Sequence, residues 1–290
     1  NMEGLRQRLE TLLLQDGAQV ACAVPALAPG VGLDAFLEKR REVADGGPLF
    51  IDVTAAVASS RGASGVDLKL LEKALSHDPH VTALLIAAAS SASQHQGKPV
   101  QTLGQALAVL GGTQSVNLVQ GLALKRGAVL TDAALLLHAT EIWEVSQRTA
   151  ECARTLARKL DLDHERCYCA GLLRGLGELT VLRCLQDWLI AGGSLDEATV
   201  RRALAQYSAS FGSALRTRWR LPLELRELIA AVYQYNTGVF TREILAMNVA
   251  GQMGSLGLED PLQALAKSKS ARLLKISESD LEGVRRKTVA

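Results

Sequence analysis

Aromatic residues are scarce in this chain, because phenylalanine, tryptophan and tyrosine together make up only 4% of its 290 residues. Hydrophobic residues nevertheless account for 48% of the sequence, so the core must be built mainly from alanine, leucine and valine. Alanine and leucine are strong helix formers, whereas sheets favour β-branched and aromatic residues. The composition therefore predicts an all-α fold.

An excess of charge of one sign is also missing. The formal net charge is +2 at pH 7, which creates no field that would attract nucleic acid or an anionic membrane. We interpret the basic segments KSKSARLLK and VRRK near the C-terminus as solvated charges. No apolar run reaches the roughly 18 to 20 residues that cross a bilayer, and no signal-peptide pattern is present. The five cysteines form no paired framework, which favours reduced thiols and a cytoplasmic location.

Apolar spacing and turn residues predict helices along most of the chain. Asp67 is expected to cap a helix that stops at Asp78-Pro79, and we expect His77 and His80, which flank this break, at the surface. Thr113 is expected to cap a helix that follows Gly111-Gly112. The expected helices span residues 3–15, 33–43, 68–77, 81–93, 102–110, 116–125, 135–160, 200–219 and 277–287, with a further helix begun by Pro222.

The order of these segments predicts three parts. Residues 1–52 form an N-terminal helical extension or linker, residues 53–128 a compact helical subdomain, and residues 129–290 a helical bundle against which that subdomain packs.

Three segments carry a resemblance to a known family: DPHVTALLIAAASSA from residue 78, KPVQTLGQALAVLGG from residue 98 and TQSVNLVQGLAL from residue 113. Their order and spacing resemble the HDOD domain, a bacterial signalling module related to HD phosphohydrolases that generally lacks their metal ligands. In the second half, the pattern continues at Trp143, Ser146, Gly212, Trp219, Leu221 and Pro222. The resemblance extends from about residue 53 to the C-terminus.

The segment AGLLRGLGELTVL, residues 170–182, resembles the stretch in which HD phosphohydrolases carry an adjacent His and Asp that hold a divalent metal. Here Arg174 and Gly175 stand in those places. A guanidinium has no lone pair to offer a metal, and glycine has no side chain. The other positions where the resemblance predicts His or Asp are Val145, Ser208, Val232 and Asn248. The resemblance therefore implies an HD-like bundle without a metal, a cofactor or catalytic residues.

Arg174 allows two interpretations. In the structural one, which we favour, it pairs with Glu178, four residues further along the same helical face. In the functional one, its planar donors bind a small anionic ligand such as a nucleotide in the vestigial cavity. His138 and Tyr233 are then further candidates for ligand contacts.

A second group of candidate ligands is the H-x-x-C-x-C pattern of His164, Cys167 and Cys169. Structural zinc needs four convergent ligands, and no C-x-x-C pair is present. We therefore interpret these cysteines as small buried hydrophobes.

The resemblance implies a non-catalytic role in signal transduction. The chain would be an output or protein-interaction part of a bacterial regulator or response regulator, and an upstream receiver or sensor domain would lie outside it. Its protein partner would contact the groove between the subdomains or an exposed apolar face. We expect neither a membrane nor nucleic acid as a partner.

Overall fold

A computed structural model describes residues 24–93, 97, 99–125, 128–233 and 240–289 of the protein. The helix expected at residues 3–15 lies outside this part of the chain. The expected all-α fold is confirmed. The N-terminal elements are α2 (Leu33–Arg41), α3 (Val53–Ser59), β1 (Arg61–Gly62), β2 (Gly65–Val66), α4 (Leu68–Leu75), α5 (Pro79–Ala92) and α6 (Leu103–Ala123). They are followed by α7 (Ala133–Lys159), α8 (His164–Leu172), the 3₁₀ turn η1 (Leu173–Gly175), α9 (Leu176–Ile190), α10 (Glu197–Arg218), α11 (Leu223–Ala231), α12 (Arg242–Ser255), α13 (Gln263–Ala266), α14 (Lys269–Leu273) and α15 (Glu278–Val289).

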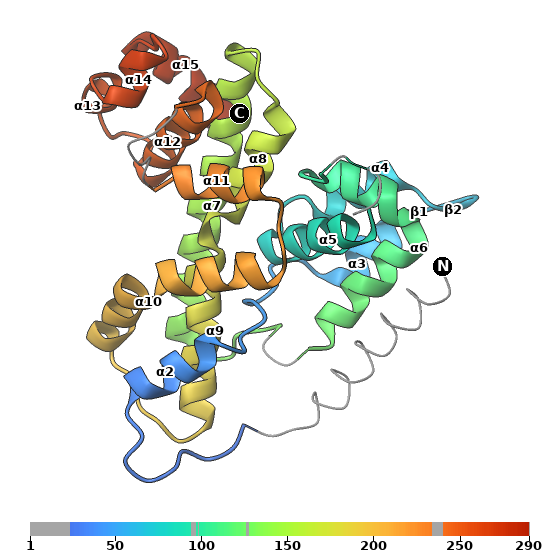
Figure 1. Cartoon of the computed structure of the whole chain (residues 1–290), viewed down its shortest axis with the longest axis vertical. Helices are drawn as coiled ribbons and strands as arrows, with labels where there is room; N and C mark the ends of the chain where they lie inside the picture. Colours follow the sequence, from blue (N-terminus) through green and yellow to red (C-terminus); the bar gives the residue numbers. More distant parts are fainter. Residues whose placement is uncertain (1–23, 94–96, 98, 126–127, 234–239, 290) are drawn as a thin grey trace.

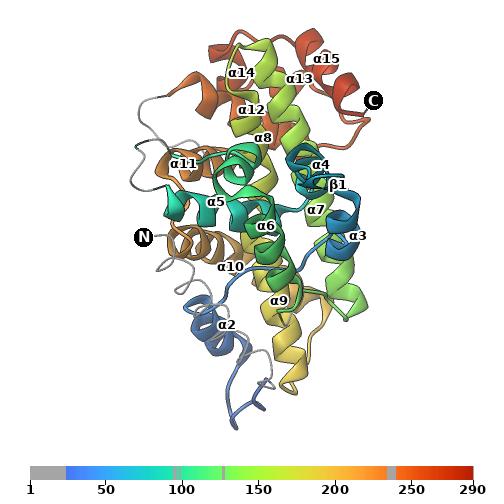
Figure 2. The same cartoon turned by 90° about the vertical axis from the view of Figure 1, so that its right-hand side faces the viewer.

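Helix α7 runs along the long axis of the molecule (Figure 1). Helices α12 to α15 gather at one end of this axis, and α2 and α9 lie toward the other end (Figures 1 and 2). Helices α3 to α6 form a group at the side. Among the described residues, no helix has both the length and the apolar character that a membrane span requires.

The main hydrophobic core is shared between the N-terminal helices and the helices that follow α6. One buried cluster includes leucines from α4 to α6 together with residues of α7, α8, α11 and α12. A second cluster joins Leu37 of α2 to α9 and α10, including Leu179 and Phe211. Among the described residues before α3, helix α2 therefore packs on the bundle.

Aspartate caps set the starts of several helices. The carboxylates of Asp52, Asp67, Asp78, Asp132, Asp163 and Asp196 each accept a backbone N–H in the first turn that follows. These bonds satisfy amides that would otherwise lack a partner, and each such cap contributes about 1 kcal/mol. The predicted cap at Asp67 is confirmed, with Oδ1 accepting from the amides of Lys69 and Leu70.

The break expected at Gly111 is confirmed, because its φ of 75° and ψ of 167° are not helical and divide α6 into two helical segments. The cap expected at Thr113 is not formed among the described residues. The chain also forms a hairpin in which Arg61 pairs with Val66. Apolar spacing could not reveal this hairpin, because its strands have two residues each and are largely exposed. Helix α12 and the shorter helices α3, α13 and α14 were not expected either. Helices α3, α13 and α14 span only one or two turns, which is too short to show an apolar period.

The Asp78-Pro79 junction joins the N-terminal helices to the bundle. The Asp78 carboxylate is buried and accepts the amides of Val81 and Phe50, at 3.0 and 2.7 Å. Burial raises the pKa of this carboxyl, and the backbone donors oppose the shift. The prediction that His80 lies at the surface was wrong, because its side chain is buried and stacks on Trp219. His77 is exposed as expected.

Candidate functional site

The turn between α8 and α9 carries Arg174 and Gly175 and lies directly against α7. A Cβ atom at Gly175 would come within 2.8 Å of the Ser146 hydroxyl and of an Ile142 methyl group. At Gly171, one turn earlier, a Cβ would approach the Ala150 Cα to 2.8 Å. These glycines let η1 and α8 approach the α7 backbone closely. The space that an aspartate at position 175 would need is therefore filled by α7.

The guanidinium of Arg174 lies between α7 and α12. Its Nη1 donates to the Thr149 hydroxyl at 2.8 Å and to the Gly251 carbonyl at 3.1 Å. Its Nη2 donates to the Ser255 hydroxyl at 3.3 Å. The guanidinium carbon also lies 5.2 Å from the centre of the Tyr233 ring, within the range of a cation–π contact. The Arg174 side chain thus links η1 to α7 and α12, the elements that surround the vestigial HD positions.

The expected direct ion pair between Arg174 and Glu178 is not formed in the described part of the chain. The Tyr233 hydroxyl lies between the two residues, 2.9 Å from Glu178 Oε1 and within hydrogen-bond distance of the Arg174 carbonyl oxygen. Burial raises the pKa of the Glu178 carboxyl, although Tyr233 and Arg174 oppose the shift. Burial also raises the pKa of the Tyr233 phenol, and the nearby Glu178 adds to the effect. The structure therefore brings the three candidate residues together through the tyrosine.

Arg216 of α10 is a member of this cluster that sequence reasoning missed. Burial lowers the pKa of its guanidinium, while Tyr233 and Glu178 raise it, so the arginine and the carboxyl lie close enough to interact. The close approach of α9 to α10 makes this possible, since a Cβ on Gly177 would come within 2.1 Å of the Ser208 carbonyl oxygen. In the sequence, the signal for this close helix packing was Gly212, which lies one turn before Arg216.

At two other vestigial positions, Val232 and Asn248, the residues form contacts that hold neighbouring helices together. Val232 is buried, and its carbonyl faces Gly251, where a Cβ would come within 2.3 Å of it. Asn248 is also buried and donates to the Ala231 carbonyl at 3.2 Å, while its Oδ1 accepts from Ser270 at 2.8 Å. These contacts hold α12 against its neighbours α11 and α14.

The remaining two vestigial positions are Val145 on α7 and Ser208 on α10. Val145 is half-buried, and its carbonyl accepts the Thr149 hydroxyl, which in turn accepts from Arg174. The Ser208 hydroxyl is buried without a hydrogen-bond partner in the described chain. The carbonyl of Ser208, and not its side chain, forms the close contact with α9.

His138 is not brought to this cluster. Its Nε2 lies 3.1 Å from Glu197 Oε2, at the start of α10. It is separated from Thr149 by roughly 16 Å along α7, given the rise of an α-helix. The sequence placed His138 on the correct helix, but the distance along that helix excludes a shared ligand with Arg174.

The described residues contain no group of three or more His, Cys, Asp or Glu side chains placed to hold a metal ion. In the H-x-x-C-x-C segment, Cys167 and Cys169 are buried, whereas the His164 side chain is 43% exposed. Burial raises the pKa of each of these two thiols to about 12, so both remain protonated and unreactive at neutral pH.

Asp78, Pro79, Arg174 and Trp219 all lie in a segment that matches a known family. The sequence model of the HDOD domain matches residues 48–235, which is well over half of the chain. The protein therefore belongs to the HDOD domain family. The match ends before the C-terminus, where the resemblance in the sequence was expected to continue. None of the curated proteins matches the chain in sequence.

Solved structures of other proteins share the fold of this chain. The MmoQ response regulator of Methylococcus capsulatus strain Bath is 19% identical, with a TM-score of 0.58 over 84% of this chain and 99% of that one. The virulence factor cj0248 of Campylobacter jejuni subsp. jejuni is 17% identical, with a TM-score of 0.58 over 87% of this chain and 97% of that one. At this level of identity, the likeness concerns the fold.

Proposed function

We propose that this chain is a non-catalytic HDOD signalling module that acts in the cytoplasm as the output or protein-interaction part of a bacterial regulator. The observation that carries the proposal is the position of the Arg174 guanidinium. Its donors are used by Thr149, Gly251 and Ser255, at the place where an HD phosphohydrolase would hold its metal. The side chain therefore serves to join helices.

The surroundings of Arg174 support a role without hydrolysis. Hard divalent cations need several oxygen or imidazole ligands at once, and a guanidinium supplies none. At Gly175 the neighbouring helix fills the space of a second ligand. A positive charge fixed at this point would also repel an incoming cation.

Signalling through a protein partner fits the family and the structural neighbours. One of these neighbours is named a response regulator and another a virulence factor. The partner would contact the seam where the α3–α6 group meets the bundle, because a ligand there touches both parts. An upstream receiver or sensor domain is the partner that we propose.

The absence of catalysis is tested by assaying the purified chain with bis-(p-nitrophenyl) phosphate and p-nitrophenyl phosphate in Mn²⁺ or Mg²⁺. We expect release of nitrophenol at the rate of the metal blank. Hydrolysis that scales with protein concentration and is abolished by a chelator would contradict the proposal.

A nucleotide sensor is the alternative function, and a thermal-shift experiment distinguishes it from the protein-interaction module. Nucleotides are added to the wild type and to Arg174→Lys, with the exposed Arg286→Lys as control, and the melting temperature is followed. Lysine keeps the charge but not the planar donor fork. We expect no nucleotide-induced shift in any of the three proteins. A shift in the wild type and in Arg286→Lys that is lost in Arg174→Lys would favour the sensor.

A further inference from the structure

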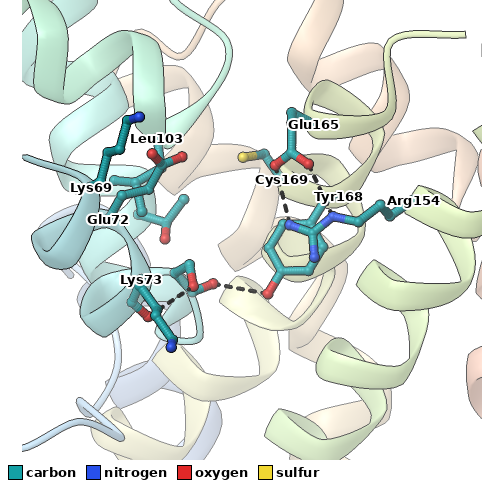
Figure 3. Close-up of a pocket in the computed structure, with 10 residues that line it drawn as sticks. Lys69, Glu72, Lys73, Leu103, Arg154, Glu165, Tyr168 and Cys169 are labelled. Carbon is teal, nitrogen blue, oxygen red and sulfur yellow. Dashed lines mark hydrogen bonds and ion pairs between the residues drawn. The ribbon is translucent and has the colours of Figure 1, made fainter. Parts of the chain in front are cut away.

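A pocket of about 250 Å³ lies at the seam between the N-terminal helices and the bundle. On one side it is lined by α4 and α5, with Glu72, Lys73 and Thr82. On the other side it is lined by α7 and α8, with Arg154, Glu165 and Tyr168. Figure 3 shows Glu72 on one side of this space and Glu165 and Tyr168 on the other. The pocket is separate from the Arg174 cluster, since it shares no residue with it.

On the bundle side of the pocket, the positive charge of Arg154 is paired with neighbouring carboxylates. Arg154 donates to Glu151 at 3.0 Å and to Glu165 at 3.1 Å, and its guanidinium lies 3.6 Å from the centre of the Tyr168 ring. The Tyr168 hydroxyl donates to the Ser76 carbonyl at 3.0 Å, which fixes the ring across the seam. The positive charge of Arg154 is therefore already matched by carboxylates and an aromatic face.

The side of the pocket formed by α4 and α5 carries the Glu72 carboxylate, which is not paired with a positive charge in this way among the described residues. Within the described chain, the Glu72 side chain forms no hydrogen bond or ion pair, and it lies across the pocket from Glu165 (Figure 3). Burial and the charge of Glu165 raise the pKa of Glu72, and Arg154 opposes this only in part. The Thr82 hydroxyl, on a residue that is 1% exposed, is also without a partner. Two acceptors in this pocket thus remain unused.

We infer that this seam pocket binds a cationic group, an ammonium or a guanidinium, between Glu72 and Glu165 with the Thr82 hydroxyl as a further acceptor. An anion would meet two carboxylates, and its only unmatched attraction would come from Lys69 and Lys73, which are exposed and solvated. A neutral apolar group would leave the Glu72 carboxylate without compensation. A cation with N–H donors satisfies both unused acceptors.

This inference goes beyond the proposed signalling role and does not depend on it. The group could be an arginine or lysine side chain of a partner protein, or a free amine. In either case the bound cation would touch α4 and α8 together and would stabilise the seam between the two parts of the chain. Such a ligand would favour one arrangement of the parts by its differential affinity.

The test follows the backbone amides of the full chain by ¹H–¹⁵N NMR during titration with two cationic probes and one anionic probe. N-acetyl-arginine methylamide represents a side chain in a peptide, agmatine represents a free amine, and inorganic phosphate is the anion. We expect saturable shifts of the Thr82, Leu103 and Tyr168 amides with at least one cationic probe. Saturation by the peptide-like probe alone would assign the ligand to a protein, and saturation by agmatine alone to a free amine.

The deciding variant is Glu72→Gln, because this side chain has no partner whose loss would disturb the fold. Its affinity for the cationic probe should fall about tenfold, the loss expected for one charge-assisted hydrogen bond. The exposed Glu259→Gln should bind as the wild type does. Equal affinity in Glu72→Gln, saturation by phosphate at the same amides, or no saturable shift with either cation would overturn the inference.

A second measurement needs no variant. The Glu72 carboxyl is titrated by ¹³C NMR with and without the cationic probe, and a bound cation should lower its pKa. An unchanged pKa at saturating probe would also overturn the inference. Because neither experiment involves a metal or hydrolysis, their failure leaves the test of the proposed function unaffected.

Discussion

The imidazole of His80 stacks on the indole of Trp219, with ring centroids 5.1 Å apart. Its Nδ1 lies 2.7 Å from the Gly47 carbonyl oxygen, and a Cβ on Gly46 would overlap the ring. One side chain therefore joins helix α5, the segment before α3 and the turn between α10 and α11. This contact explains why a histidine within the Asp78-Pro79 motif is buried.

The burial of His80 predicts a loss of stability in acid. Burial lowers its pKa from 6.5 to about 4, so the neutral ring is favoured in the folded state. The resulting stability is fully present above pH 6.5 and is lost as the pH falls toward 4, at most by about 1.4 kcal/mol per pH unit. Urea unfolding between pH 4 and 7 should show a flatter pH dependence for His80→Phe than for the wild type. The exposed His164→Phe is the control and should keep the wild-type slope.

Removal of the Arg174 side chain should destabilise the fold. Arg174→Ala loses hydrogen bonds to Thr149, Gly251 and Ser255, and we expect a cost of about 2 kcal/mol in the free energy of unfolding. Arg286→Ala removes an exposed arginine of α15 and should change this free energy by less than about 0.5 kcal/mol. Equal stabilities of the two variants would show that Arg174 does not join the helices.

The close crossing of α9 and α10 predicts a specific cost for a methyl group. Gly177→Ala places a Cβ against the backbone of Ser208, which cannot rotate away, so we expect a loss of about 1–3 kcal/mol. Gly283→Ala, in α15, meets no atom within 4 Å and should stabilise its helix by up to about 1 kcal/mol. Thermal unfolding of both variants measures the difference. Similar shifts in the same direction would contradict the crossing.

The raised pKa of Glu72 also has a consequence for stability. A folded pKa above the unfolded value means that its contribution is present below the unfolded pKa and is lost as the pH rises through the folded pKa. At pH 7, Glu72→Gln should therefore be as stable as the wild type or more stable. A clear decrease in the melting temperature of Glu72→Gln relative to Glu259→Gln would contradict the isolated carboxylate described above.

Much of the fold could be predicted from the sequence because its signals are local. Asp67 and Asp78 mark helix starts through bonds to amides two or three residues away, and the long apolar spacing of α7 is visible without tertiary contacts. The position of Arg174 in an HD-like frame was also a local signal. The sequence could therefore identify Arg174 and Gly175 in this frame, and the loss of metal binding there stays a prediction.

Tertiary contacts account for what the sequence did not predict. The partners of Arg174 come from Thr149 and Ser255, which only the packing of α12 on α7 brings close. The expected pairing of Arg174 with Glu178 relied on helical spacing, but the 3₁₀ turn η1 interrupts the helix there. The Tyr233 hydroxyl lies between the two residues and contacts both. The burial of His80 likewise depends on Trp219, far away in the sequence.

The central claim is that an HD-like shell has kept its packing while its metal site has been replaced by structural contacts around Arg174. Its most direct test is the metal content of the purified chain after incubation with Mn²⁺ and Fe²⁺ followed by desalting, measured by inductively coupled plasma mass spectrometry. We predict a metal content far below stoichiometric for the wild type and no difference from Arg174→Lys. A stoichiometric, tightly held ion in the wild type would contradict the claim.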